Sequence, residues 1–117
     1  MTDYMILIHS SDAAWAALSP AELQREMGAY FAYTQALRDA GVYVRGDQLT
    51  PATTAKSVRV RDGKTGVVDG PYADTKEQLG GYYLITVASE AEAVGWGAKC
   101  PGAKYGTVEV RACVANS

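Results

Sequence analysis

Two segments of the chain are apolar on both of their alternating faces. Residues 3–9 place Tyr4, Ile6 and Ile8 on one side and Met5, Leu7 and His9 on the other. Residues 81–87 alternate in the same way, with Tyr83, Ile85 and Val87 opposite Tyr82, Leu84 and Thr86. Successive side chains of a strand point to opposite faces, so this pattern is typical of a strand covered on both sides. We therefore expect 3–9 and 81–87 to be the central strands of one sheet.

Two helices are predicted from their capping residues. Residues 19–22, Ser-Pro-Ala-Glu, supply an N-cap, a first-turn proline and a capping-box glutamate, and predict a helix to about residue 40. Gly41 follows as a left-handed C-terminal cap. Steps of three and four predict one buried face on this helix, made of Leu23, Met27, Tyr30, Phe31, Thr34 and Leu37. Residues 89–92 repeat the capping-box spacing and predict a helix to about residue 99, and a short helical piece is expected over 12–18.

The other strands are expected to be shorter. Residues 57–61 and 64–68 flank Asp62-Gly63, and the alternation together with this two-residue turn predicts a β-hairpin. Residues 42–44 predict a short strand, followed by a Gly/Asp/Thr/Pro-rich connection through Thr54. The last strand, 106–113, should have one buried and one polar face, with Val108, Val110 and Ala112 opposite Glu109, Arg111 and Cys113.

This order of elements is that of a ferredoxin-like split βαβ unit with an added β-hairpin, an α+β fold. The 117 residues suit one domain, 1–117. Two helices cover only one face of the sheet, and an exposed row of Met5, Leu7, Tyr82 and Leu84 or its opposite would be an unusual apolar patch for a monomer. We therefore expect a homodimer packed sheet to sheet. The alternative is a monomer whose long connection completes a two-sided core.

Composition narrows the classes of partner. The formal charge is −2 and the isoelectric point about 5.3, and the scattered Lys and Arg residues form no basic stripe, which argues against direct binding to nucleic acid. The start of the chain lacks the basic-then-apolar order of a secretory signal, and no segment has the apolar length of a membrane span. We therefore expect a cytoplasmic protein without a membrane partner, whose Cys100 and Cys113 are reduced thiols.

The stretch 69–85, DGPYADTKEQLGGYYLI, joins a sharp turn, a charged segment and an aromatic strand. It resembles the DGPF branch of the YCII-related family, whose Asp-Gly-Pro-Phe run stands here as Asp69-Gly70-Pro71-Tyr72. Supporting similarity lies in DYMILIH, SPAEL and PGAKYGTVEVR, so the resemblance covers nearly the whole chain. It implies a ferredoxin-like subunit that forms a dimeric α/β barrel, with a presumed cavity near the segment that follows the turn. Tyr72 departs from the family's phenylalanine by adding a hydroxyl.

Several residues around this stretch are candidates for binding or chemistry. Asp69 could present a catalytic carboxylate to a cavity whose wall includes Tyr72, although the Asp-Gly-Pro run is equally explained as a sharp exit from the hairpin. Lys76 and Glu77 could bind and polarise a small polar ligand beside Tyr82, or form a solvated ion pair.

Two further candidates lie on other strands. His9 is the only histidine and could act as a general base, or could be a hydrogen-bonded residue at the end of its strand. Arg111 could contribute a cation to the same cavity, and Tyr105 just before that strand a hydroxyl, or both could be solvated at an edge. The histidine–aspartate pair of better-known YCII-type proteins has no counterpart, since the first helix lacks a histidine and Cys100-Pro101 stands where the aspartate would be.

The sequence leaves the activity open. We expect no cofactor and no metal, because no nucleotide-binding glycine loop, serine-hydrolase elbow or metal-ligand spacing occurs. The first hypothesis is a small-molecule-binding or enzymatic dimer with a pocket between sheet and helices. The alternative, taken from the family resemblance, is a non-catalytic interaction module for an extracytoplasmic-function sigma factor. Dimeric α/β barrels also include cofactor-free monooxygenases and haem-degrading enzymes, but no residue here selects that chemistry.

Overall fold

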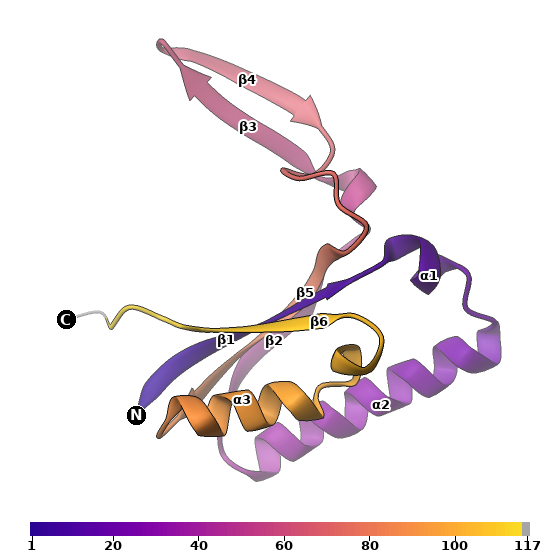
Figure 1. The fold of residues 1–117 in the computed structure, drawn as a ribbon, viewed down its shortest axis with the longest axis vertical. Helices are drawn as coiled ribbons and strands as arrows, with labels where there is room; N and C mark the ends of the chain where they lie inside the picture. The colour runs from indigo at the N-terminus through magenta and orange to yellow at the C-terminus, as the bar shows by residue number, and fades with distance from the viewer. Residues whose placement is uncertain (116–117) are drawn as a thin grey trace.

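The computed structural model describes residues 1–115, which form a four-stranded antiparallel sheet, a separate hairpin and three α-helices (Figure 1). The strands of the sheet are β1 (Thr2–Ser10), β2 (Tyr43–Gln48), β5 (Gln78–Val87) and β6 (Thr107–Ala112), in the order β2-β5-β1-β6. The helices are α1 (Asp12–Ala16), α2 (Pro20–Asp39) and α3 (Glu90–Lys99), with 3-10 turns η1 (Ala52–Thr54) and η2 (Pro101–Lys104). The two central strands are the predicted ones, and the arrangement is consistent with a ferredoxin-like α+β fold.

One face of the sheet carries the hydrophobic core. Helices α2 and α3 lie along the same side of the sheet (Figure 1), where Leu37 and Ala93 pack with Ile6, Ile85 and other buried strand residues. The opposite face carries the alternate residues of the same strands, which remain partly exposed. Its central part is the row Met5, Leu7, Tyr82 and Leu84. The structure thus decides which face meets the helices, a choice that the sequence pattern left open.

The ends of α2 are as predicted, but its buried face is not. Ser19 and Glu22 form both hydrogen bonds of the capping box, and Gly41 has a φ of 73° after the last turn. However, the fully buried residues of the helix are Tyr33 and Leu37, whereas Met27 and Phe31 are 50% and 76% exposed. The predicted stripe was wrong for these two residues and for Leu23, which is also exposed, because a period of 3.6 shows which residues share a face and not what covers that face.

The predicted hairpin consists of β3 (Lys56–Arg61) and β4 (Lys64–Asp69). Asp62 and Gly63 have φ values of 52° and 75°, the left-handed conformation that a tight two-residue turn requires. In Figure 1 the hairpin projects away from the sheet and the helices. Its valines are exposed, namely Val58, Val60, Val67 and Val68. The hairpin therefore contributes nothing to the core of its own chain.

Strand β2 is longer than predicted. Residues 45–48, which were assigned to a connection, pair with Leu84, Tyr83, Tyr82 and Gly81 of β5. A Cβ atom at Gly46 would lie 2.6 Å from Cδ1 of Tyr83, so the strand tolerates only glycine at this close approach. The same glycine made the segment resemble a loop in the sequence.

Helix α3 is confirmed in spite of its two glycines. At Gly97 a Cβ atom would lie 2.9 Å from Cγ2 of Val110, so this glycine allows the helix to lie close to β6. Both cysteines are free thiols, and burial raises the pKa of the Cys100 thiol, which favours its unreactive form. Within residues 1–115, no helix combines the length and the apolar character needed to cross a membrane.

Candidate functional site

A cleft of about 630 Å³ lies between α2 and the β2–β5 side of the sheet. Helix α2 forms one wall, and the strands β2 and β5 form the other. Trp15 of α1, Pro51 before η1 and Tyr105 after η2 complete the lining. The rim is tied together where Oδ2 of Asp12 accepts a hydrogen bond of 2.8 Å from the backbone N–H of Ala52. The volume is within the usual range for small-molecule sites in proteins.

The wall formed by α2 is apolar and open to solvent. Met27, Phe31, Thr34 and Arg38 lie three or four residues apart and line the cleft together. Phe31 is 76% exposed although it is the only phenylalanine of the chain. An exposed apolar surface that borders a cleft of this size is typical of a binding site.

Two tyrosines provide hydroxyl groups at the end of the cleft next to η2. Burial is the main cause that raises the pKa of Tyr30, and the neighbouring Tyr105 adds to this effect. Burial also raises the pKa of Tyr105. Gly102 makes room for this arrangement, because a Cβ atom there would lie 2.8 Å from the Tyr30 hydroxyl. Both phenols therefore stay neutral at physiological pH and can donate hydrogen bonds.

A polar cluster borders the cleft at the sheet edge. The Tyr82 hydroxyl donates a hydrogen bond of 2.6 Å to Oδ2 of Asp47, and Arg45 lies 3.1 Å from the same oxygen. The hydrogen bond from Tyr82 is the main cause that lowers the pKa of Asp47, and the hydrogen bond from Arg45 adds to this effect. The guanidinium of Arg38 lies over the ring of Tyr43 at 4.5 Å from its centre. Two candidates from the sequence border this cleft, namely Tyr105 and Tyr82, and the side chain of Tyr82 belongs to the opposite face of the sheet, in the row with Leu7.

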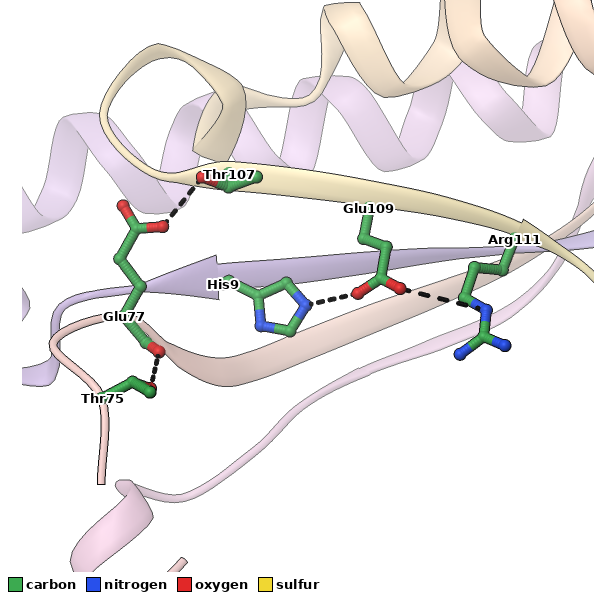
Figure 2. A network of polar contacts seen from close by, with 6 residues as sticks. All are labelled: His9, Thr75, Glu77, Thr107, Glu109 and Arg111. Atoms are coloured by element: carbon green, nitrogen blue, oxygen red, sulfur yellow. Dashed lines mark hydrogen bonds and ion pairs between the residues drawn. The ribbon is translucent and has the colours of Figure 1, made fainter. Parts of the chain in front are cut away.

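His9 belongs to a different network, on the face of the sheet away from the helices (Figure 2). Its Nε2 lies 3.0 Å from Oε1 of Glu109, and Oε2 of Glu109 lies 3.9 Å from Nε of Arg111. The three side chains come from β1 and β6, which pair directly. The structure thus brings the predicted residues His9 and Arg111 together through Glu109. Sequence reasoning placed Glu109 on the polar face of its strand but gave it no role in a site.

Glu77 lies at the end of the same face. Its Oε1 accepts a hydrogen bond of 2.8 Å from the hydroxyl of Thr107, and its backbone carbonyl accepts one from Thr75 (Figure 2). Lys76 is exposed, and no ion pair joins it to Glu77 within the described residues. The alternative of a solvated Lys76–Glu77 ion pair is therefore not found in this part of the chain, and ligand binding by the two residues stays a prediction.

The Asp-Gly-Pro-Tyr turn lies at the base of the hairpin and apart from the cleft. Asp69 forms an ion pair of 2.5 Å with Lys56, and the backbone N–H of Gly70 donates a hydrogen bond of 2.7 Å to the carbonyl of Ala55. Gly70 has a φ of 110°, which only glycine adopts without strain. Tyr72 is 87% exposed. These contacts agree with the structural explanation of the turn, and the catalytic role of Asp69 stays a prediction.

Sequence reasoning missed most of the cleft, although one signal was present. The repeat of Met27, Phe31 and Thr34 along α2 is visible in the sequence, but it was assigned to the core. The contribution of β2 was hidden by its loop-like composition. In the described part of the chain, no three His, Cys, Asp or Glu side chains are arranged to hold a metal ion.

Comparison with known proteins covers nearly the whole chain. The YCII-related domain family matches residues 2–115. An uncharacterised protein of Rhizobium meliloti (strain 1021) is 36% identical over 110 residues, which span 92% of this chain and 89% of that protein. The assignment to the DGPF branch stays a prediction. With the family match extending from the first strand past the last one, the chain belongs to the YCII-related family.

Proposed function

We propose that this protein binds a small molecule in the cleft between α2 and the β2–β5 side of the sheet. The observation that carries the proposal is the exposed apolar wall of α2, where Met27 and Phe31 border a cleft of about 630 Å³. Leaving such a wall in water costs free energy that a bound ligand would recover. The proposed cleft lies between sheet and helices, as the sequence led us to expect, but Asp69 and Tyr72 are not among the residues that line it.

The polar groups of the cleft would orient the ligand. Gln35, Arg38 and the hydroxyls of Tyr30 and Tyr105 line an otherwise apolar and aromatic surface. A few polar groups in a mainly apolar pocket are the usual means by which proteins select a ligand. Because the phenols are neutral donors, they suit a carbonyl, ether or carboxylate oxygen.

Binding can be tested with N-phenyl-1-naphthylamine, an uncharged aromatic dye whose fluorescence rises in apolar surroundings. We expect saturable binding of one dye per chain, and a loss of affinity of about tenfold in Phe31→Glu, since a charge replaces a large apolar contact. Phe31 is mostly exposed, so this variant should fold normally. The matched control is Val94→Glu, which adds the same charge at an exposed position of α3 outside the cleft.

The proposal fails if the dye does not bind saturably, or if Phe31→Glu binds it as well as Val94→Glu does. Native mass spectrometry of protein purified without added ligand provides an independent check. A discrete retained mass that is present in Val94→Glu and absent from Phe31→Glu would identify a natural ligand of the cleft.

A second candidate concerns the opposite face of the sheet. We propose that two chains pack through the row Met5, Leu7, Tyr82 and Leu84 and form a dimeric α/β barrel, as the family resemblance implies. The partly exposed apolar row and the His9–Glu109 contact of 3.0 Å support this proposal. A partner sheet would shield this contact from water, which strengthens its electrostatics. His9 would then be a general base oriented by Glu109.

A further inference from the structure

We propose that the ligand of the cleft is an organic anion with an aromatic body, and that Arg38 binds its charged group. This inference rests on the proposed binding function and adds the chemical class of the ligand. It follows from the charge of Arg38 and from the aromatic residues of the lining.

Arg38 is a cation of the cleft that has no ion-pair partner among residues 1–115. It lines the cleft with its guanidinium over the ring of Tyr43, and no carboxylate of residues 1–115 lies within 4.0 Å of it. Its neighbour Asp39 accepts a hydrogen bond from Gln35 instead. The planar guanidinium, held against a ring, presents its remaining N–H groups for a bidentate contact with a carboxylate or sulfonate.

The two acidic residues of the lining already have partners. Oδ2 of Asp12 accepts the backbone N–H of Ala52, and Oδ2 of Asp47 accepts the Tyr82 hydroxyl and lies beside Arg45. The negative charge of Asp47 is thus neutralised by Arg45 of the same strand. This arrangement leaves Arg38 as the lining charge that a ligand can neutralise.

The rest of the lining favours an aromatic body. The lining includes the aromatic residues Trp15 of α1, Tyr30 and Phe31 of α2, and Tyr83 of β5. Aromatic pairs contribute stabilisation beyond that of the buried area alone. A ligand of one or two rings with an acidic group would therefore contact the rings with its body and Arg38 with its charge.

Two dyes that share one ring system separate these contributions. We would measure the affinity of 8-anilinonaphthalene-1-sulfonate and of its uncharged analogue N-phenyl-1-naphthylamine for the full chain and for Arg38→Gln. The sulfonate should bind about three- to tenfold more weakly to the variant, while the neutral dye is unaffected. Arg25→Gln removes the same charge from α2 outside the cleft and should leave both dyes unchanged. Added salt should weaken the binding of the sulfonate dye and leave the binding of the neutral dye unchanged.

The possible outcomes are distinct. If both dyes bind and Arg38→Gln affects neither, or affects both equally, the inference about the anion is overturned while binding in the cleft stands. If Arg25→Gln weakens the sulfonate as much as Arg38→Gln does, the effect is one of net charge and the inference is again overturned. If neither dye binds saturably, or Phe31→Glu changes nothing, the proposed function fails and the inference fails with it.

Discussion

Gly46 shows how a single residue positions the wall of the cleft. It stands in β2 opposite Tyr83, whose hydroxyl lies 2.7 Å from that of Thr34 on α2. The missing side chain lets the ring of Tyr83 lie against the backbone of β2, and Thr34 holds the other end of the ring. One glycine thus connects the edge strand, a buried aromatic residue and the helix that faces the cleft.

Replacing Gly46 with alanine should destabilise the protein. The new Cβ would lie 2.6 Å from Cδ1 of Tyr83 and 2.9 Å from the Tyr82 carbonyl oxygen, so we expect a loss of about 1–3 kcal/mol in the free energy of unfolding. Urea denaturation measures this change. The control is Gly28→Ala in α2, where no atom lies within 4 Å and a gain of up to about 1 kcal/mol is expected. Equal stabilities of the two variants would contradict the packing argument.

The elements differ in how far they depend on one another. Helices α2 and α3 are held on the sheet by the core, to which Leu37, Ala93 and Ile85 contribute. The hairpin contributes no residue to that core and is held together by its own ladder and by the Asp62-Gly63 turn. Isolated two-stranded hairpins are at best marginally stable in water. The hairpin should therefore be able to unfold locally while the sheet and the helices stay folded.

Deletion of the hairpin tests this independence. Lys56 and Asp69 pair across its base, so a Gly-Gly link in place of residues 57–68 can join them. We expect the shortened chain to retain its helical circular dichroism and a cooperative thermal transition, because the core is intact. Ile85→Asp, which places a charge at a fully buried position, should abolish the transition in the same assay. A shortened chain without a transition would show that the hairpin is part of the folding unit.

At the scale of the whole molecule, the two faces of the sheet have different surroundings. One is covered by the helices, and the other presents half-exposed apolar side chains with a polar margin of His9, Glu109 and Arg111. The proposed dimer would cover the second face. The proposed ligand cleft lies on the helical side, so the two proposals can be tested separately. Association with a sigma factor stays a prediction from the family resemblance.

Leu84→Arg tests the proposed dimer. Leu84 lies opposite Met5 in the middle of the open face, and a charge there should prevent two sheets from packing. Light scattering after gel filtration should give twice the 12.4 kDa of one chain for the parent and the single mass for the variant. Val94→Arg on exposed α3 should stay dimeric. If the unsubstituted protein has the mass of one chain at micromolar concentration, the sheet-to-sheet arrangement is refuted.

Local signals determined most of the fold. The capping box at Ser19, the left-handed Gly41 and the Asp62-Gly63 turn act over a few residues, so they can be recognised in the sequence. The doubly apolar strands 3–9 and 81–87 likewise indicated their central place, since apolar residues on both faces are typical of the inner strands of a sheet. These features were sufficient for the order of elements and for the strand order that follows from it.

Tertiary contacts decided the site. Whether Met27 and Phe31 lie in the core or on the wall of a cleft depends on which elements pack against α2, which no short-range pattern records. The pairing of His9 with Glu109 joins residues that are 100 positions apart, through the register of β1 with β6. The sequence by itself determined which segments form helices and strands, because capping and alternation are local. Only the tertiary structure decided which side chains meet, because that depends on register and on the packing of distant segments.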